Sequence, residues 1–406
     1  MKPKQRLVVI GNGMAGMRTI EELLSASPDQ YDITVFGAEP YGNYNRIMLS
    51  AVLAGDKTVE DIVINPREWY VENKIKLHAG EKKAVARIER GFKKVIAVDG
   101  TTASYDRLLI ATGSKAIFPK VDGNHLNGVI SFRDIVDVNK MLEYSRTHKK
   151  AIVLGGGLLG LEAANGLALR GMDVTVIHRN EVLLNRQLDK TAAKLLQSEL
   201  EQRGITFKMA AKLQKLIGNE EKHIVAAQFQ DGSELACDLL IAAIGIEPNI
   251  AIAKEAGLYC EHGIVVNDTL QSYDPSIYAV GECIQHRGST FGLVAPLFEQ
   301  AKVCANHLSS HGVAEYVTLP TATKLKVTGI QLFSVGDFMG DAESESITFS
   351  DPALGIYKKL VLKANQLIGA VLYGDTADGS WYQELLETQK SVVEMRDKLI
   401  FGKAYT

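Results

Sequence analysis

Two glycine-rich stretches are the residues of this sequence whose spacing best fits a chemical task. Residues 11–16 read GNGMAG and residues 155–160 read GGGLLG, so each has the form G-x-G-x-x-G. In this pattern the first glycine makes a turn, the second lets the backbone approach a pyrophosphate, and the third lets a helix pack on a strand. The N–H groups at the helix N-terminus then hold the phosphates. Each stretch therefore predicts a dinucleotide site.

The elements around both stretches have the order that this chemistry needs. The first stretch follows the apolar run LVVI and leads through a helical pattern to YDITVFG, while the second follows AIVL and leads to MDVTVI. Apolar β-formers, a glycine break and apolar residues at helical spacing predict strand, turn, helix and strand in both places. The sequence thus predicts two Rossmann-like units, each seeding a parallel sheet.

Two dinucleotide sites in one chain favour electron transfer between the two ligands. A nicotinamide gives up two electrons as hydride, whereas a flavin accepts a hydride and releases electrons singly. The sequence therefore favours an FAD enzyme that is fed by NAD(P)H. Tight turns without a ligand are the alternative, and a pair of loops favours it less than a single loop would.

The remainder of the chain has a different pattern. From about residue 316 the runs KLKVTGIQLFSVGDF and IYKKLVLKANQLIGAVLYGD predict short strands separated by turns. The stretch ELLETQKSVVEMRDKLIF then predicts a closing helix. The predicted fold class is α/β, with two Rossmann-like dinucleotide-binding domains and a small C-terminal α+β domain.

The amino-acid composition limits the classes of binding partner and the cellular location expected for this chain. Hydrophobic residues make up 46% and charged residues 23% of the chain, and no apolar run reaches the roughly 20 residues of a membrane span. The net charge of −3, with both signs mixed, does not favour nucleic acid or a membrane surface as a partner. The four cysteines are spread singly, which argues against a disulfide framework, a zinc site or a protein-bound iron–sulfur cluster, and the nine histidines show no close metal-ligand spacing, so no metal site is expected. We expect a soluble, cytoplasmic protein.

The order of the motifs GNGMAG, ATGS, GGGLLGLEAA, AIGIEPN and IYAVGE resembles the FAD-dependent pyridine nucleotide-disulfide oxidoreductase superfamily, over residues from about 6 to 310. Longer strings, among them ITVFGAEPYGNYNRIMLS and GIVVNDTLQSYDPSIYAVGEC, are most similar to the flavoprotein module of the assimilatory NAD(P)H nitrite reductase large subunit and to nitrate reductase electron-transfer subunits. The resemblance implies an FAD-binding domain of residues 1–118 and 246–315, an NAD(P)H-binding domain of residues 119–245 and a C-terminal interface domain of residues 316–406.

The resemblance also implies which residues contact each cofactor. The FAD contacts would come from the first loop, the crossing strand, the return of the chain to the first domain and two arginines: Gly11, Gly13, Met14, Ala15, Gly16, Glu39, Arg46, Val85, Thr112, Gly113, Arg133, Gly281, Glu282 and Val294. The NAD(P)H contacts would come from the second loop, its helix, the end of the next strand and the second crossing: Gly155, Gly157, Leu158, Leu159, Gly160, Glu162, His178, Arg179 and Gly245.

Three departures from the family pattern affect these assignments. Many members have an acid where this chain has Gly37, so Glu39 is either the ribose ligand or a solvated loop acid. Ferredoxin-serving members often have a lysine where this chain has Ala51, so Glu162 is either a catalytic group near the nicotinamide or a structural acid at a helix N-terminus. Residues 1–236 contain no cysteine, which excludes a thiol relay, and Cys283 is expected to serve packing.

The end of the second strand in the second unit predicts the electron donor. An NAD site normally has an acid there for the ribose 2′-OH, whereas this chain has His178-Arg179. A guanidinium can bind a 2′-phosphate bidentately, so NADPH is slightly favoured. The alternative is that Arg179 faces solvent and His178 stacks on adenine, as an NADH enzyme would also tolerate.

The function implied is a reductase that passes hydride from NAD(P)H to FAD and then electrons, one at a time, to a separate metalloprotein. That partner would be an iron–sulfur and sirohaem nitrite reductase or a nitrate reductase, unless the chain is a fragment of a larger reductase. A rubredoxin or ferredoxin reductase is the first alternative. A flavin-bound binding or assembly protein is the second, and feeble turnover with ferricyanide would identify it.

Overall fold

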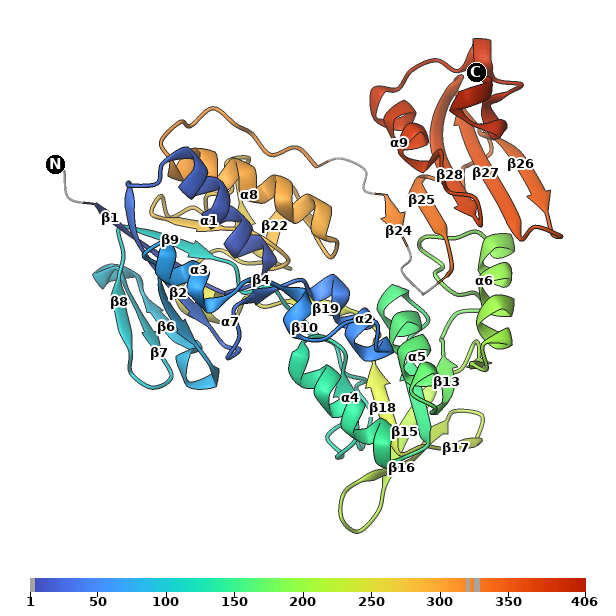
Figure 1. Cartoon of the computed structure of the whole chain (residues 1–406), viewed down its shortest axis with the longest axis horizontal. Helices are drawn as coiled ribbons and strands as arrows, with labels where there is room; N and C mark the ends of the chain where they lie inside the picture. The colour runs from blue at the N-terminus through green and yellow to red at the C-terminus, as the bar shows by residue number, and fades with distance from the viewer. Residues whose placement is uncertain (1–3, 319–321, 325–328) are drawn as a thin grey trace. The chain divides into compact units, whose positions relative to one another are not determined.

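The computed structural model describes residues 4–318, 322–324 and 329–406 (Figure 1). The chain forms two compact units, and both are discontinuous in sequence. The first contains Met1–Leu49, Lys57–Lys115 and Ile246–Thr318, and the second contains Ser50–Asp56, Ala116–Gly245 and Leu319–Thr406. The domain boundaries expected from the sequence remain predictions.

The first unit is built on a five-stranded parallel sheet of order β21-β9-β1-β2-β5. Its strands are β1 (Gln5–Ile10), β2 (Tyr31–Gly37), β5 (Lys76–Ala79), β9 (Arg107–Ile110) and β21 (Ile277–Ala279). The apolar run of β1 is buried along its length, as a sheet with covered faces requires. Helix α1 (Met14–Ala26) joins β1 to β2 and packs along α8 (Val294–Leu308) (Figure 1).

Smaller elements complete the first unit. Strand β3 (Asn43–Tyr44) pairs with β4 (Val63–Asn65), and β6 (Val85–Glu89), β7 (Lys94–Ala97) and β8 (Thr102–Ser104) form an antiparallel sheet. A mixed sheet contains β20 (Ile264–Val266), β22 (Ile284–His286) and β23 (Ser289–Thr290), and the short helices are α3 (Arg67–Glu72) and α7 (Ala251–Glu255). Strand β10 (Ser114–Ala116) pairs with β19 (Ile246–Pro248). The last pair lies where the chain leaves and re-enters the unit.

The second unit repeats the same sheet. Its order is β11-β18-β12-β13-β14, again parallel, with β11 (Val129–Ser131), β12 (Lys150–Leu154), β13 (Asp173–Ile177), β14 (Thr206–Lys208) and β18 (Leu239–Ala242). Helix α5 (Leu158–Leu169) joins β12 to β13. The other elements are α2 (Leu49–Ala54), α4 (Ile135–Thr147), α6 (Lys190–Gln202) and the antiparallel strands β15 (Leu213–Gly218), β16 (Ile224–Phe229) and β17 (Glu234–Ala236).

The C-terminal part of the second unit has its own antiparallel sheet. The order is β24-β25-β28-β27-β26, with β24 (Thr323–Lys324), β25 (Leu332–Gly336), β26 (Glu345–Asp351), β27 (Ile356–Lys363) and β28 (Gln366–Tyr373). Helix α9 (Gly379–Thr388) covers it, and Phe333, Leu360 and Tyr382 lie in the shared core. The predicted α/β class with a small C-terminal α+β part is therefore confirmed.

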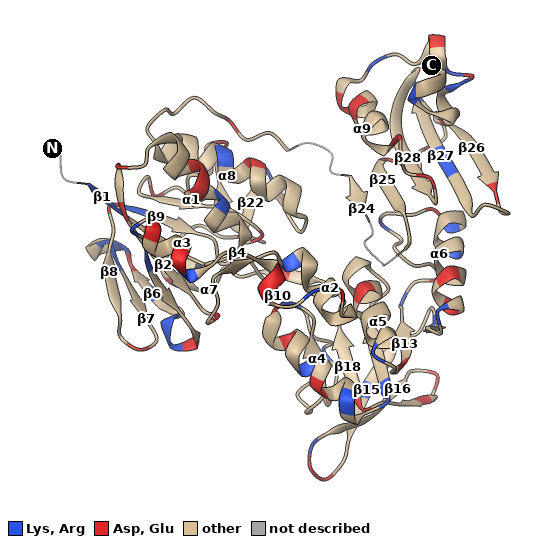
Figure 2. Cartoon of the chain, in the orientation of Figure 1, with Lys and Arg blue, Asp and Glu red and all other residues tan. Residues whose placement is uncertain are grey.

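The surface carries charges of both signs. Figure 2 shows acidic and basic residues interspersed on both units, for example along α6. None of the helices in the described ranges combines the length and apolar character that a membrane crossing needs.

Candidate functional site

The first glycine loop lies at the carboxyl end of β1, between β1 and α1. The N–H of Gly11 donates to the carbonyl of Phe36 on β2 at 2.8 Å, and the N–H of Met17 donates to the carbonyl of Gly13 at 3.0 Å. On the other side of β1, the N–H of Ala111 after β9 donates to Ile10 at 2.8 Å. The loop is thus held by both neighbouring strands at the edge where parallel sheets bind nucleotides.

The second glycine loop repeats these bonds. The N–H of Gly155 donates to Ile177 on β13 at 2.9 Å, and that of Leu161 donates to Gly157 at 3.0 Å. The N–H of Ala243 after β18 donates to Leu154 at 2.9 Å. The chain therefore builds the same arrangement twice from different residues. Each glycine loop, with the two strands that hold it, is called a cradle below.

The glycines themselves show that the cradles fit a ligand. A Cβ on Gly11 would overlap the carbonyl oxygen of Ala111, and one on Gly16 would lie 2.9 Å from the carbonyl oxygen of Gly11. The protein's own packing thus requires the first and third glycines. The middle residue, Gly13, has ordinary extended φ, and a Cβ there would meet nothing within 4 Å.

The second loop shows the same contrast. A Cβ on Gly155 would overlap Ala243 and one on Gly160 would overlap Gly155, but one on Gly157 would meet nothing within 4 Å. Neither packing nor backbone conformation therefore explains glycine at the middle position of either loop. Space for a pyrophosphate explains it in both.

The helix N-termini behind both loops carry no side-chain cap. Gly13 caps α1 and Gly157 caps α5, and neither helix has an acid in its first turn. In contrast, Asp134 caps α4 and Asp189 caps α6 through side-chain oxygens. The free N–H groups and positive dipole of α1 and α5 are thus available to an anionic phosphate.

The first loop is anchored by a residue that the sequence did not single out. The Asn12 amide donates to the carbonyl of Tyr41 at 3.1 Å, and its oxygen accepts from the Tyr70 hydroxyl at 2.6 Å. The same hydroxyl accepts from the N–H of Asn43 at 3.2 Å. Asn12 lies inside the motif, but nothing in the sequence pairs it with the buried Tyr70.

Glu39 lies just after β2 in a polar cluster of the first unit. Its carboxylate accepts from the Tyr44 hydroxyl at 2.6 Å and pairs with the Arg46 guanidinium, which also lies 4.9 Å from the Tyr44 ring centroid. The structure thus brings the predicted residues Glu39 and Arg46 together. Their contacts to FAD remain predictions.

The returning chain joins the same edge of the first sheet. The Thr112 hydroxyl donates to the carbonyl of Asn249 at 2.7 Å, and the Asn249 N–H donates to Gly113 at 2.9 Å. The Ser114 hydroxyl donates to the Glu282 carboxylate at 2.7 Å. Thr112, Gly113 and Glu282 are therefore near neighbours, and their contacts to FAD remain predictions.

Other predicted FAD residues are distributed differently. Val294 begins α8, whose N-terminus has no side-chain cap. Val85 lies at the start of β6, opposite Ala97 on β7. Arg133 belongs to the second unit, where its N–H donates to Asp137 at 2.8 Å near the start of α4. Its predicted contact to FAD stays a prediction.

His178 follows β13 and faces the second glycine loop. The N–H of Gly156 donates to His178 Nδ1 at 3.1 Å, so a neutral His178 carries its proton on Nε2. Burial lowers the pKa of His178, and the neighbouring Arg179 lowers it further. The imidazole is therefore neutral at pH 7 and supports the loop.

The other predicted NAD(P)H residues lie on the same edge. Arg179 is exposed, and within the part of the chain that the structure describes it forms no ion pair. Leu158 and Leu159 begin α5, and Glu162 lies half-buried one turn further. Gly245 has φ +137° at the second crossing. A catalytic role for Glu162 remains a prediction.

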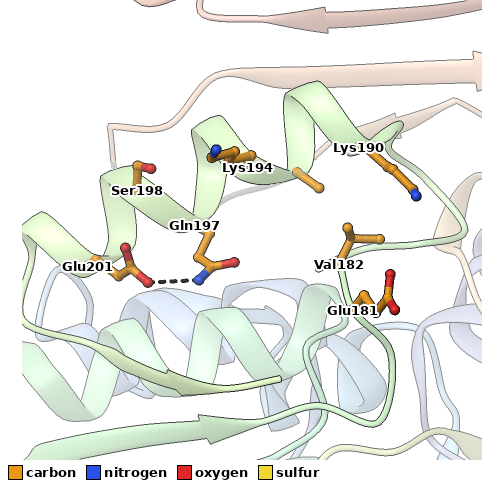
Figure 3. A pocket seen from close by; sticks show the side chains of 8 residues that line it. Glu181, Val182, Lys190, Lys194, Gln197, Ser198 and Glu201 are labelled. Carbon is orange, nitrogen blue, oxygen red and sulfur yellow. Dashed lines mark hydrogen bonds between the residues drawn. The ribbon is translucent and has the colours of Figure 1, made fainter. Parts of the chain in front are cut away.

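A cavity of about 320 Å³ lies beside α6, near the loop after β13 (Figure 3). Lys190 and Lys194 line it together with Glu181 and Glu201, and the Gln197 amide donates to Glu201 at 2.8 Å. None of the predicted cofactor residues lines this cavity. It is a mixed-charge surface hollow separate from the glycine-loop edge.

Cys283 follows Glu282, and its thiol is in an environment that makes it unreactive. It is fully buried, its thiol lies 3.3 Å from the carbonyl oxygen of Val280, and burial raises its pKa to about 11. A thiol of this kind stays protonated and unreactive. Among the described residues, histidine, cysteine, aspartate and glutamate form no group of three or more that could hold a metal ion.

Paired Rossmann units with two open glycine cradles define a flavin- and nicotinamide-binding oxidoreductase. The chain belongs to the pyridine nucleotide-disulphide oxidoreductase family, whose model matches residues 5–307. Residues 321–390 match the model of the rubredoxin NAD+ reductase C-terminal domain. The resemblance drawn from the sequence is confirmed, and the protein is an FAD-dependent NAD(P)H oxidoreductase.

Two curated relatives match nearly the whole chain. A nitrite reductase [NAD(P)H] of Bacillus subtilis is 46% identical over 96% of this chain and 48% of its own length. The assimilatory nitrate reductase electron transfer subunit of the same organism is 43% identical over 98% of this chain and 51% of its own length. The chain thus spans about half the length of these relatives.

Solved reductases share the fold. A ferredoxin reductase from Rhodopseudomonas palustris has a TM-score of 0.86 and 24% identity, covering 96% of both chains. An NADH:rubredoxin oxidoreductase from Clostridium acetobutylicum has a TM-score of 0.79 and 26% identity, covering 96% of this chain and 97% of its own.

Proposed function

We propose that this chain is the NAD(P)H-oxidising flavoprotein part of a nitrite or nitrate reductase system. The observation that carries the proposal is the similarity along nearly the whole chain to two relatives that are named for these two systems. The electrons would leave to an iron–sulfur and sirohaem nitrite reductase or to a nitrate reductase. The absence of cysteine from residues 1–236 supports direct transfer from the flavin instead of transfer through thiols.

The chain's residues contribute mainly by positioning. FAD, when bound, supplies the conversion of a two-electron donor into single-electron steps. The N–H groups at the start of α1 hold its pyrophosphate beside Gly13, and those at the start of α5 hold the donor beside Gly157. Asn12 and His178 fix the two loops from behind. Hydride transfer needs no protein acid or base, so Glu162 would act by position.

The experiment is reduction of purified acceptors by the purified protein with NADPH. Nitrite reductase and nitrate reductase catalytic components should be reduced at least about tenfold faster than rubredoxin or ferredoxin at equal concentration. Equal or faster reduction of rubredoxin would contradict the proposal and favour the alternative function, a rubredoxin or ferredoxin reductase. That alternative is supported by the match of residues 321–390 to the rubredoxin NAD+ reductase C-terminal domain.

The finer proposal is that NADPH is the preferred donor. Arg179 is exposed and without an ion pair among the described residues, and no acid stands beside it at the end of β13. Arg179→Ala should lower kcat/KM for NADPH by about ten- to a hundredfold, the effect of losing a charged phosphate contact, and change that for NADH less than about twofold. Arg186→Ala, an exposed arginine of the same loop, is the control. An equal loss with both donors would reject the assignment.

A further inference from the structure

A buried glutamine on α8 holds the turn that follows β21. Gln300 is completely buried, and its Oε1 accepts from the N–H of Gly281 at 2.8 Å. Gly281 has φ +96°, and a Cβ there would lie 3.2 Å from the Cβ of Ala15 on α1. The turn is thus confined between α1 and α8. A buried N–H in this place needs an acceptor, and Gln300 supplies it.

The other end of the Gln300 amide is also fixed. Its Nε2 donates to the Tyr316 hydroxyl at 3.4 Å. Tyr316 is 3% exposed, its N–H donates to the carbonyl of Asp268 at 2.8 Å, and its ring lies edge-on to His286 with centroids 5.0 Å apart. The amide therefore cannot turn without losing one of its bonds, and its oxygen stays directed at Gly281.

The turn that Gln300 holds lies at the nucleotide edge of the sheet. Glu282, the next residue, accepts from the Ser114 hydroxyl at 2.7 Å, and a Cβ on Gly113 would lie 3.9 Å from the same carboxylate oxygen. Ala15 belongs to the first glycine loop. A shift of Gly281 would therefore move the carboxylate relative to the crossing strand and press on the start of α1.

We propose that Gln300 is a positioning residue for FAD, which sets the place of the Gly281-Glu282 turn against the first glycine loop. The inference rests on the proposed function and on the FAD contacts that the resemblance implies for Gly281 and Glu282, at the ribityl and phosphate portion of the cofactor. It adds a completely buried residue that acts through the N–H of Gly281 and that lies outside both glycine motifs.

The test compares two buried glutamines whose side-chain oxygens both accept from backbone N–H groups, but in different loops. Gln300→Met keeps the volume of the side chain but removes the hydrogen-bond acceptor for Gly281. Gln300→Glu keeps the acceptor, because a protonated carboxyl accepts and donates like the amide. Gln285→Met is the matched control. Gln285 is 5% exposed and accepts from the N–H groups of His262 and Gly263 at 2.9 and 3.3 Å, neither of which belongs to the Gly281-Glu282 turn.

Two readouts are used: the dissociation constant of FAD from titrated apoprotein, and amide hydrogen exchange at Gly281 in the apoprotein. Gln300→Met should weaken FAD binding about tenfold, the worth of one buried hydrogen bond, and speed the exchange. Gln300→Glu should stay within about threefold of wild type. Gln285→Met should lower the melting temperature and leave both readouts unchanged.

Wild-type FAD affinity in Gln300→Met, or an equal loss in Gln285→Met, would overturn the positioning role. If Gln300→Met does not fold, Tyr316→Phe decides in its place, since it removes only the hydroxyl that orients the amide. A rise of about threefold in the FAD dissociation constant supports the proposal and no rise overturns it. A wild-type apoprotein that takes up no FAD would overturn the assignment of Gly281 and Glu282 as well, which separates the two failures.

Discussion

In the first glycine loop Asn12 stands beside Gly37, and in the second Gly156 stands beside His178. A Cβ on Gly37 would lie 2.8 Å from the Cβ of Asn12, and a Cβ on Gly156 would lie 3.0 Å from Cγ of His178. Between each glycine loop and the end of the next strand, therefore, there is space for one side chain only. In the first unit this space holds Asn12 of the loop, and in the second unit it holds His178 after the strand.

This difference suits the two ligands. The amide of Asn12 is bound to Tyr41 and Tyr70, so the first loop is tied into its unit. The second loop has no side chain at this position. The N–H of Gly156 donates to His178, its carbonyl accepts from the N–H of Leu184 at 3.0 Å, and the adjacent Arg179 stays exposed. A loop whose side chain is bonded to the buried Tyr70 suits a resident FAD, and an exposed arginine beside the second loop suits a nicotinamide nucleotide that must come and go.

The largest expected effect comes from filling the open middle position of each loop. Gly13→Val should abolish FAD binding, and Gly157→Val should raise the dissociation constant of NAD(P)H by about a hundredfold or more while FAD stays bound, because each side chain occupies the space of a pyrophosphate. Absorbance of bound flavin and donor titration measure the two. Gly91→Val, where a Cβ also meets nothing within 4 Å, is the control. Loss of folding in both loop variants would show that the glycines serve packing instead.

The next effect tests whether the shared space admits one side chain. Gly156→Asn should destabilise the protein by about 1–3 kcal/mol through overpacking against His178 and Leu183. Adding His178→Gly should recover part of that loss, since it recreates the arrangement of the first loop. Unfolding of the two single variants and the double variant gives the coupling energy. Strict additivity would contradict the exclusion.

A smaller effect tests the anchoring of the first loop. Tyr70→Phe removes the donor to Asn12 and the acceptor for the N–H of Asn43, and should cost about 1 kcal/mol of stability. FAD binding should weaken with it, because the tied loop is the feature that suits a resident cofactor. Tyr144→Phe, which changes a half-buried tyrosine of the second unit, is the control. Equal behaviour of the two variants would remove the argument for a specially anchored first loop.

The sequence predicted the fold and both loops because local patterns determine them. Apolar runs beside G-x-G-x-x-G specify strand, turn and helix without reference to the rest of the chain. The residues behind the loops were not predictable in this way. Tyr70 reaches Asn12 across 58 positions and Gln300 reaches Gly281 across 19, and no pattern encodes either distance.

The closing helix expected over ELLETQKSVVEMRDKLIF is confirmed only for residues 384–388 and is wrong for residues 389–401. Helix α9 ends at Thr388, Gln389 takes φ +50°, and short 3-10 turns follow. The reason is tertiary: the N–H of Val392 donates to Asn365 at 2.9 Å in the turn between β27 and β28, and Val392 is fully buried. Pairing with a distant turn outweighs the local helical propensity.

The smallest expected effect follows from protonation of His178, which has no counterpart at Gly37. Burial lowers the pKa of His178 below its ordinary 6.5, so the unfolded chain takes up a proton before the folded chain does. Stability from this residue is present above pH 6.5 and is lost progressively as the pH falls from that value through the lower pKa of the folded state, because a protonated Nδ1 cannot accept from Gly156. Between pH 7.5 and 5.5 the loss of stability should stay below the limit of about 1.4 kcal/mol per pH unit.

His178→Gln should reduce this loss of stability, and the exposed His125→Gln should not. FAD affinity should stay constant over the same range, and a parallel fall in FAD affinity would show that the two cradles respond to pH together.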